Sequence, residues 1–273
     1  MILVAGGTGC LGRAIVELLA HRPHRILTRN PTAPEHVRGD VRDRASLDAA
    51  MAGVRAVVSA MHGFVGKGLS PDSVDRQGNE NLIDAARGCE RFILLSVRGA
   101  APDHPMDLFR AKYAAEQRLI ASGVPYTIVR PTAFVETWLQ VLGAPLLTKG
   151  KTTIFGRGQN PINFVSVVDV ARVVVAALDD PGMAGRTVDV AGPSNISFDE
   201  LVDRFQTITG ATGKRSHVPL PVMRASAWLT RPFSAALARM IRAGVVMDTT
   251  DMTCASQNGT SVDDAIRRVY PRV

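Results

Sequence analysis

The 273-residue chain has few cysteines and few aromatic residues: three Cys, and Phe, Trp and Tyr together at 5%. Cys10, Cys89 and Cys254 follow no CxxC or Cys/His spacing, which excludes a zinc-finger type of metal site and a disulfide framework. We therefore predict no metal site. We expect the cysteines to be free thiols in a reducing compartment, packed as small buried hydrophobic side chains.

Long apolar runs are also missing from the sequence. No segment approaches the roughly 18 to 20 uncharged apolar residues that a membrane span requires. No basic segment precedes the apolar run 2–5, so we expect no secretory signal and a cytoplasmic location. The net charge of +7 is spread over scattered Lys and Arg residues without a basic block, which argues against a nucleic-acid partner and favours a small anionic ligand.

Short apolar, β-branched runs alternate with helical patterns in the first half of the chain. Strands are predicted at 1–5, 24–29, 56–61, 91–97 and 126–130, with a weaker one at 36–41, and helices at 10–21, 45–53, 73–87 and 107–122. Continuous apolar strands separated by helices indicate a parallel sheet covered on both faces. Right-handed crossovers then give a doubly wound, Rossmann-type α/β sheet.

The pattern changes after residue 131. We predict helices at 134–147 and 167–179, strands at 152–155, 162–165 and 187–191, and a helix to Thr209 opened by a Ser197/Glu200 capping box. Residues 217–245 are typical of two short helices broken at Arg231-Pro232. The expected organisation is a Rossmann domain of residues 1–150 and a smaller C-terminal substrate lobe of residues 151–273, interleaved with the first domain.

The first strand leads into a glycine-rich turn, Gly6-Gly7-Thr8-Gly9-Cys10-Leu11-Gly12. Gly6, Gly9 and Gly12 let the chain turn tightly, bring backbone N–H groups against a pyrophosphate and pack the next helix closely on the strand. No Gly-Lys-Ser/Thr follows, so the turn is not a P-loop. The context of strand, turn and helix predicts a dinucleotide site.

The end of the second strand indicates which nucleotide binds. An NAD-selective site has an acidic residue there, whereas this chain has Arg29 about 20 residues past the turn. A guanidinium can bind a 2′-phosphate through two parallel hydrogen bonds, which favours NADP(H) over NAD(H); NAD(H) and a solvated surface Arg29 are the alternatives. Asp40 is either an acceptor for the adenine amino group or a plain turn residue.

At this point the chain resembles the short-chain dehydrogenase/reductase superfamily in its atypical, NmrA-like branch, over about residues 1–210. The motifs that carry the resemblance are the glycine turn, Thr28-Arg29-Asn30-Pro31, Gly39-Asp40-Val41-Arg42-Asp43, Leu95-Ser96-Val97, Lys112 with Glu116, and residues 122–131 (SGVPYTIVRP). They are specific for the fold and the dinucleotide but not for a substrate.

The resemblance implies a role for each matching residue. The residues implied at the pyrophosphate are Gly6, Thr8, Gly9, Cys10, Leu11 and Gly12. Those implied at the 2′-phosphate, adenine and adenosine ribose are Arg29, Asp40, Val41, Ala60 and Met61. Those implied at the nicotinamide, its ribose and its carboxamide are Ser96, Val97, Lys112, Pro131, Thr132, Ala133 and Phe134.

The chain departs from the better-known members in its catalytic motif. They use Tyr-x-x-x-Lys, in which the Tyr donates a proton to the carbonyl oxygen, but Leu108 stands four residues before Lys112. Tyr113 is about 100° round the helix from Lys112 and is expected to point elsewhere. Candidate donors are Ser96, His62, Tyr113 and Lys112 itself. The alternatives are a surface ion pair of Lys112 with Glu116 and a plain loop position for His62.

These features predict an NADPH-dependent reductase that transfers hydride to a small carbonyl compound, quinone or conjugated alkene without the usual Tyr. A non-catalytic NADP(H) sensor or assembly factor and a nucleotide-sugar epimerase or dehydratase are the alternatives. We expect a monomer or homodimer. The glycine-rich stretch 63–68 is either a loop that closes over substrate or a plain loop. The segment 217–245 carries four arginines together with Trp228 and Phe233. It suits a substrate cap, a membrane-surface patch, a contact with another subunit or protein, or ordinary amphipathic packing.

Overall fold

The computed structural model describes residues 1–64, 66, 68–230 and 233–271. Contacts divide the chain into two compact units, one of Met1–Pro131 with Val168–Val190 and one of Thr132–Val167 with Ala191–Val273. Each unit is described by itself. The predicted domain boundary at residue 150 stays a prediction, because contacts within a folded chain do not measure independent folding.

The first unit is built on a seven-stranded parallel sheet with strand order β10-β6-β5-β4-β1-β2-β3. Its strands are β1 (Ile2–Ala5), β2 (His24–Thr28), β3 (His36–Arg38), β4 (Ala56–Ser59), β5 (Arg91–Leu95), β6 (Tyr126–Pro131) and β10 (Arg186–Val190). The predicted doubly wound Rossmann-type sheet is confirmed, including its weakest strand, β3. The strand order reverses between β1 and β4, which is where open α/β sheets bind their ligands.

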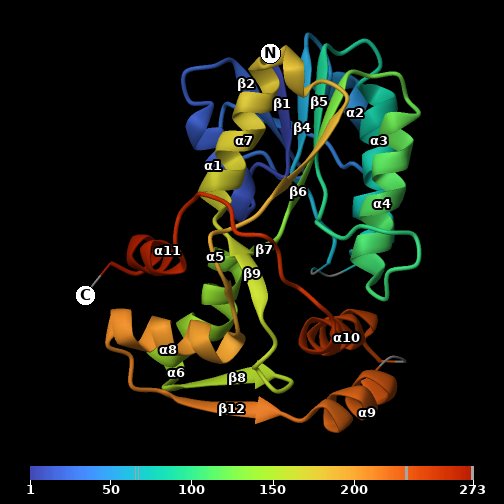
Figure 1. The fold of residues 1–273 in the computed structure, drawn as a ribbon. Helices are drawn as coiled ribbons and strands as arrows, with labels where there is room; N and C mark the ends of the chain where they lie inside the picture. The colour runs from blue at the N-terminus through green and yellow to red at the C-terminus, as the bar shows by residue number, and fades with distance from the viewer. Residues whose placement is uncertain (65, 67, 231–232, 272–273) are drawn as a thin grey trace. The chain divides into compact units, whose positions relative to one another are not determined.

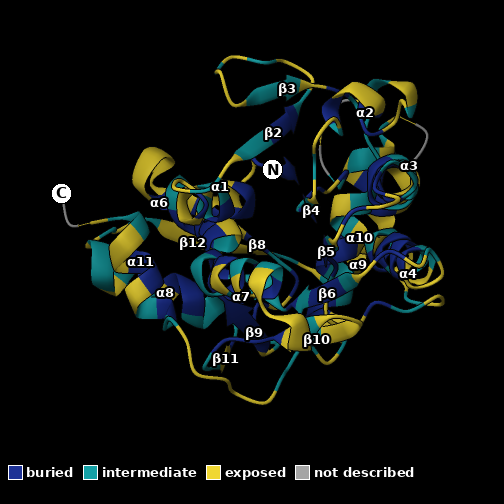
Figure 2. Cartoon of the chain, turned by 90° about the horizontal axis from the view of Figure 1, so that it is seen from above, coloured by how far each residue is buried: buried dark blue, intermediate teal, exposed yellow. Residues whose placement is uncertain are grey.

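Helices cover both faces of this sheet. They are α1 (Cys10–Leu18), α2 (Ala45–Ala50), the π-helical turn η1 (Asp72–Arg76), α3 (Gln77–Ala85), α4 (Asp107–Ile120) and α7 (Val167–Asp179), with a 3-10 turn η3 (Pro181–Met183) before β10. Figure 1 shows α1 and α7 on one face and α2, α3 and α4 on the other. Buried and exposed residues alternate around these helices in Figure 2, as expected for amphipathic helices lying on a sheet.

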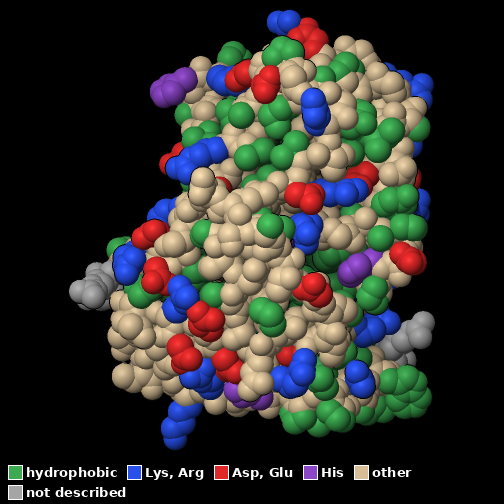
Figure 3. All heavy atoms as spheres, in the orientation of Figure 1, with side chains coloured by type: hydrophobic (Ala, Val, Ile, Leu, Met, Phe, Trp, Pro, Cys, Tyr) green, Lys and Arg blue, Asp and Glu red, His purple; other side chains and the backbone are tan. Residues whose placement is uncertain are grey.

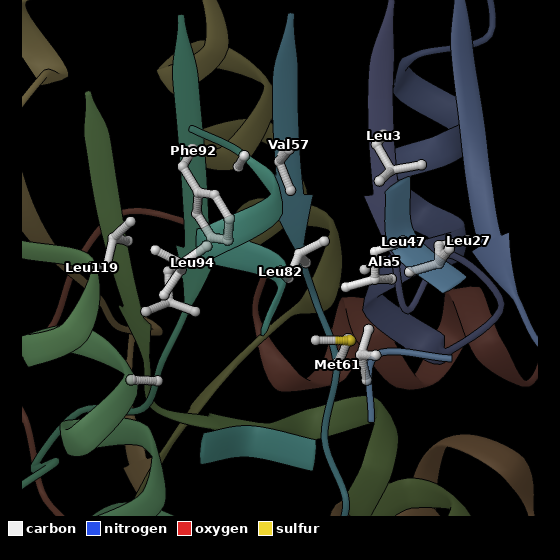
Figure 4. Packing of buried hydrophobic residues seen from close by; sticks show 14 of the residues in the cluster. Leu3, Ala5, Leu27, Leu47, Val57, Met61, Leu82, Phe92, Leu94 and Leu119 are labelled. Atoms are coloured by element: carbon white, nitrogen blue, oxygen red, sulfur yellow. The ribbon is translucent and has the colours of Figure 1, made fainter. Parts of the chain in front are cut away.

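The core on the α3 and α4 face holds the carboxyl ends of the strands in place. Leu3 of β1, Val57 of β4 and Phe92 of β5 are completely buried there with Leu82 of α3 and Leu119 of α4 (Figure 4). Burying one such side chain stabilises the fold by about 1.5–3 kcal/mol. This packing fixes β1, β4 and β5 against α3 and α4, so the strands whose ends carry the candidate site are held in place.

The second unit contains two small sheets and most of the remaining helices. Its strands are β7 (Ala133–Phe134), β8 (Lys151–Phe155), β9 (Ile162–Val165), β11 (Asn195–Ile196) and β12 (Lys214–Val218), paired in the orders β11-β9-β7 and β12-β8. Its helices are α5 (Val135–Trp138), η2 (Leu139–Gly143), α6 (Ala144–Lys149), α8 (Phe198–Thr209), α9 (Leu220–Thr230), α10 (Ala235–Thr249) and α11 (Val262–Val269). The N-cap half of the predicted capping box is present, because Ser197 Oγ accepts a hydrogen bond of 3.1 Å from Glu200 N. The Glu200 carboxylate accepts instead from Arg204 Nε and Nη2 at 3.1 Å and 2.6 Å.

The prediction that a helix begins at residue 217 was wrong. His217 and Val218 belong to β12, and the first helix begins at Leu220. The break predicted at Arg231-Pro232 lies outside the described residues, as do residues 65 and 67 of the stretch 63–68. In the part of the chain that is described, no helix has both the length and the apolar character to cross a bilayer.

Candidate functional site

The turn between β1 and α1 is too crowded for side chains at two of its glycines. Gly6 has a φ of +85°, and a Cβ there would lie 2.5 Å from the carbonyl oxygen of Ala60. A Cβ on Gly12 would lie 2.0 Å from the carbonyl oxygen of Gly6. Real Cβ atoms do not approach backbone oxygens this closely, so both positions require glycine.

The N-terminus of α1 is suited to an anion. Gly9 occupies the N-cap position without a side-chain hydrogen bond, and the first turn of the helix carries no acidic residue. A helix N-terminus carries a partial positive charge and unpaired N–H groups. The turn can therefore receive a pyrophosphate without competition from a carboxylate of its own helix.

A pocket of about 250 Å³ lies in the first unit, at the carboxyl ends of β1, β2 and β4. Predicted site residues that line it are Gly6, Thr8, Gly9, Arg29, Asp40, Val41, Ala60, Met61 and His62. Leu27, Thr28, Gly39, Arg42, Leu69 and Val74 complete the lining together with Ala5. Segments far apart in the sequence thus meet where the resemblance implies the adenosine half of the cofactor; their contacts with a cofactor stay predictions.

The pocket has two guanidinium groups and one carboxylate at the ends of β2 and β3. Asp40 accepts hydrogen bonds from Arg42 at 3.0 Å from Nε, 2.6 Å from Nη2 and 3.0 Å from the backbone N. The hydrogen bonds from Arg42 hold the pKa of Asp40 below its ordinary value; partial burial opposes this effect, and the charge of Arg29 adds to it. Arg42 was not predicted as a site residue, although it stands in the motif that follows Asp40.

Lys112 connects the carboxyl ends of two neighbouring strands. Its Nζ donates hydrogen bonds of 2.8 Å to the carbonyl oxygens of Met61, after β4, and Leu95, at the end of β5. It also lies 3.0 Å from Oδ1 of the completely buried Asp75. The other carboxylate oxygen of Asp75 accepts a hydrogen bond of 2.7 Å from Gly63 N. Two ammonium hydrogens are therefore directed at backbone carbonyl oxygens, while Asp75 Oδ1 is an ion-pair partner of Lys112 that receives no hydrogen bond among the described residues.

Sequence reasoning missed Asp75, although a signal was present. Asp75, Asn79, Leu82 and Ala86 recur at helical spacing and are all completely buried. An acidic residue in register with an apolar stripe requires a buried partner, because an unpaired buried charge is costly. Lys112, which is already implied at the carboxyl ends of the strands, is the cation that could have been assigned as this partner.

The alternative of a surface ion pair between Lys112 and Glu116 was wrong. Glu116 is completely buried and accepts hydrogen bonds from Arg130 Nε at 2.8 Å and Nη2 at 2.5 Å. The two residues lie one helical turn apart on α4, yet each has a partner from a different segment. The i, i+4 spacing therefore reflects two separate buried ion pairs.

Ser96 is a buried hydroxyl without a hydrogen-bond partner among the described residues. Its backbone N donates to Val129 O at 2.8 Å, which places the residue directly past the end of β5. Leaving such a group unpaired costs about 1–3 kcal/mol, so the position of this hydroxyl calls for a partner such as a bound ligand or a water molecule. This orphaned oxygen fits the predicted position beside a nicotinamide.

The remaining candidate donors differ in their surroundings. His62 lines the pocket, and desolvation by the surrounding protein lowers its pKa below the ordinary value; Lys112 adds to this decrease and Asp75 opposes it. The imidazole is therefore neutral near pH 7. Tyr113 is half-buried on α4 near the charge of Arg130, and it is not among the residues that line the pocket.

The segment predicted to cover the nicotinamide carboxamide crosses from one unit to the other. Pro131 ends β6, whereas Thr132, Ala133 and Phe134 belong to the second unit. Thr132 Oγ1 donates a hydrogen bond of 2.8 Å to Asn163 Oδ1, and β7 pairs with β9 in parallel. Their role at the cofactor stays a prediction.

The other predicted positions are in or beside the strand ends and α1. Leu11 is buried in α1, and Val97 is half-buried after β5. The described cysteines form no disulfide; Cys89 is buried as expected, whereas Cys10 is exposed and Cys254 half-buried, so the expectation of a buried side chain was wrong at Cys10. Cys10 stands at the first position of α1, whose buried residues are Leu11, Gly12 and Ile15. Among the described residues, no three His, Cys, Asp or Glu side chains are grouped to hold a metal ion.

The parallel sheet, the glycine turn at its switch point and the cation-lined pocket define a Rossmann-type dinucleotide-binding protein. Residues 6–181 match the model of the NAD(P)H-binding family, and the chain belongs to this family. The resemblance to the atypical, NmrA-like short-chain reductases is confirmed.

Two curated relatives are reductases by name. The chain is 32% identical over 222 residues to an NAD(P)H azoreductase of Xenophilus azovorans, covering 77% of this chain and 74% of that protein. It is 34% identical over 220 residues to a (4-alkanoyl-5-oxo-2,5-dihydrofuran-3-yl)methyl phosphate reductase of Streptomyces griseus, with the same two coverages.

Among solved structures, an Escherichia coli NADPH-dependent quinone oxidoreductase in complex with NADPH superimposes with a TM-score of 0.77. The two sequences are 20% identical, and the match covers 99% of this chain and all of that one (100%). A Staphylococcus aureus nucleoside-diphosphate-sugar epimerase superimposes with a TM-score of 0.72 at 23% identity, covering 97% and 99% of the two chains. At these identities the similarity shows the shared fold.

Proposed function

We propose that the protein is an NADPH-dependent reductase that transfers hydride to a small quinone, conjugated alkene or carbonyl compound. The observation that carries the proposal is the pocket at the carboxyl ends of β1, β2 and β4, with its crowded glycine turn and two arginines. The two curated relatives support the reaction class, because both are reductases. The bound nicotinamide would supply the hydride.

The residues of the chain would hold the cofactor along the switch point of the sheet. The turn 6–12 and the N-terminus of α1 would bind the pyrophosphate, and Arg29 would bind the 2′-phosphate with Arg42 nearby. Ala60 and Met61 would lie against the adenosine ribose. Ser96, Val97, Lys112 and residues 131–134 would surround the nicotinamide end. NADPH is preferred in this arrangement because the pocket places positive charge at the end of β2.

Proton supply would come from a residue other than a catalytic Tyr. Lys112 donates hydrogen bonds to the carbonyl oxygens of Met61 and Leu95 and forms an ion pair with Asp75, so we assign it to positioning the strand ends and supplying positive charge. The Ser96 hydroxyl and the neutral His62 imidazole remain as groups that can donate a hydrogen bond to a substrate oxygen and relay a proton to it, each taking up a proton from solvent as it gives one. A quinone or an enal needs only such a donor and an apolar slot.

Steady-state oxidation of NADPH with a panel of quinones, enals, ketones and azo dyes tests the proposal. We expect turnover with at least one class, and a higher kcat/KM with NADPH than with NADH. Binding of NADPH is measured separately by isothermal titration calorimetry. Tight NADPH binding without turnover of any compound would contradict the reductase and leave the cofactor site intact.

The proposed substrate is a small molecule, and the proposed assembly is a monomer or homodimer in the cytoplasm. The Streptomyces griseus relative, named as a reductase of an alkanoyl-dihydrofuranyl methyl phosphate, supports a small-molecule substrate. Light scattering after size-exclusion chromatography measures the mass of the particle. A larger assembly would contradict the second proposal.

A further inference from the structure

Helix α9 lacks the polar face that a surface helix normally has. Met223 and Ala227 are buried on one side of it. Successive residues turn by about 100°, so Val222, Ala225 and Leu229 lie on the opposite side, which is exposed. Val222 and Leu229 are 51% and 59% exposed. The helix is therefore apolar both where it packs and where it faces solvent.

The exposed apolar surface extends to the start of α10, which packs against α9. We define the α9–α10 surface by its large exposed hydrophobic residues Val222, Trp228, Leu229, Phe233, Leu237 and Met240. Trp228 is 76% and Phe233 90% exposed, in a chain that contains only two Trp residues. Figure 3 shows hydrophobic side chains gathered over α9 at its lower right. Contiguous apolar surface of this kind marks an interaction site.

The charge of the same segment has one sign. Residues 220–247 contain four Arg, at positions 224, 231, 239 and 242, and no Asp or Glu. Arg224 and Arg242 are exposed. Helices with Trp, Phe and Leu on one side and basic residues beside them lie in the interface of anionic bilayers. Each basic residue near such a surface adds electrostatic attraction to it.

Hydrogen bonds to the loop between β8 and β9 hold the end of α10, and with it the α9–α10 surface. Asp248, near the end of α10, is buried and accepts hydrogen bonds of 3.1 Å and 3.2 Å from the backbone N atoms of Arg157 and Gly158. Asn160 Nδ2 donates to the carbonyl oxygens of Met247 and Thr250 at 2.6 Å and 2.8 Å. The loop between β8 and β9 therefore anchors α10, so the apolar residues are presented by an ordered element.

The positive charge of the α9–α10 surface distinguishes between the partners that could bind it. A second copy docking face to face would bring the exposed Arg224 and Arg242 of both copies together without an acidic partner in the segment, which opposes a two-fold interface. Nucleic-acid phosphates would pair with the arginines but leave the Trp, Phe and Leu side chains unmatched. An anionic lipid surface matches both features, with acyl chains for the apolar groups and headgroups for the arginines.

We propose that the α9–α10 surface binds the surface of a membrane that contains anionic lipids, with Trp228 and Phe233 at the boundary between headgroups and acyl chains. The binding is peripheral. It is independent of the proposed reductase activity.

Vesicle flotation tests this proposal with the full-length protein. We expect it to float with vesicles of phosphatidylcholine and phosphatidylglycerol at low salt, to bind less at high salt, and not to bind phosphatidylcholine alone. In a Trp138→Phe background Trp228 is the only tryptophan, and its emission should shift to the blue on binding. The double variant Trp228→Ser/Phe233→Ser should bind at least about tenfold more weakly.

Leu147→Ser provides the matched control, because Leu147 is 47% exposed in α6 of the same unit but outside the α9–α10 surface. This variant should bind vesicles as the unchanged protein does. Arg224→Glu/Arg242→Glu should lose the preference for anionic vesicles.

Three results would overturn the proposal. These are absence of binding to anionic vesicles at low salt, equal binding to both kinds of vesicle, and equal loss in the control variant. A dimer in solution that dissociates in the Trp228→Ser/Phe233→Ser variant would instead assign the surface to a second copy. Turnover and NADPH binding are measured in parallel, so failure of the membrane proposal and failure of the reductase are distinguished.

Discussion

At the scale of single residues, the Lys112–Asp75 pair connects four segments around the candidate site. Lys112 is on α4, Asp75 is on η1, and the carbonyl groups of Met61 and Leu95 end two adjacent strands. A buried ion pair contributes little net stability compared with apolar residues, but removing one partner leaves a buried charge. The pair therefore makes the geometry of the strand ends depend on two specific side chains.

Asp75→Asn should destabilise the fold by about 3 kcal/mol, because the Lys112 ammonium loses its counterion. It should also lower kcat/KM for NADPH about tenfold or more, because the strand ends and Gly63 lose a fixed position. Urea unfolding and steady-state kinetics measure the two effects.

The control is Glu116→Gln, which disturbs a different completely buried carboxylate, on α4 and paired with Arg130. It should cost comparable stability and leave the KM for NADPH nearly unchanged. An equal rise of KM in both variants would show that Asp75 acts through general destabilisation.

Arg29→Ala should lower the ratio of kcat/KM for NADPH to that for NADH by about tenfold to a hundredfold, the loss expected for charge-assisted hydrogen bonds. Kinetics with both cofactors measure the ratio. Arg25→Ala is the control, because Arg25 lies on the same strand and donates to Ala52 O instead of lining the pocket. An unchanged ratio in Arg29→Ala would assign 2′-phosphate recognition to another residue.

His62 should make stability depend on pH. Its pKa is lower in the folded protein than the ordinary value near 6.5, so the unfolded chain binds more protons between the two values. Stability is complete above the unfolded pKa and decreases as the pH falls through this window. Urea unfolding at a series of pH values should show a steeper decrease for the unchanged protein than for His62→Gln, and parallel curves would contradict the assignment.

At the scale of elements, the β1–α1 turn depends on two close approaches to one oxygen. A Cβ on Gly12 would lie 2.0 Å from the Gly6 carbonyl oxygen, whereas one on Gly9 would lie 3.3 Å from it. Gly12→Ala should therefore cost about 1–3 kcal/mol of stability and abolish NADPH binding, and Gly9→Ala should cost less stability. Thermal unfolding and calorimetry measure the two effects, and equal stability of the two variants would contradict the packing argument.

The elements differ in how well the sequence predicted them. The buried strands of the first unit have continuous apolar residues and were found, together with the helices between them. Strand β12 was missed, because four of its five residues, Lys214 to His217, are polar and show no apolar periodicity. Helix α11 was also missed, although Ser261 and Asp264 form a capping pattern at its start.

The site was predicted only where its features are visible in the local sequence. Backbone-driven features such as the glycine turn are visible in local sequence. Arg42 and Asp75 act through partners that only the fold brings near, so spacing along the chain did not single them out. The Lys112–Glu116 spacing was misleading, because tertiary partners replaced the local pair.

At the scale of the whole molecule, the first unit needs residues 168–190 to complete its sheet. A fragment of residues 1–150 lacks β10, which pairs with β6, and α7, which covers the same face as α1. We expect the fragment to aggregate and to show no cooperative unfolding, because it exposes an unpaired strand edge and apolar surface. Circular dichroism during heating measures this, with the full chain as control. Cooperative unfolding of the fragment would support an independent domain of residues 1–150.

The late arrival of β10 has a consequence for synthesis on the ribosome. The edge of β6 stays open while Thr132–Val167 of the second unit emerges, since Thr127 pairs with Arg186. Pairings so distant along the chain form slowly. The nascent protein therefore passes through a stage in which most of its nucleotide-binding sheet exists but its last strand is still being made, and this is the stage at which a chaperone has the most exposed backbone to protect.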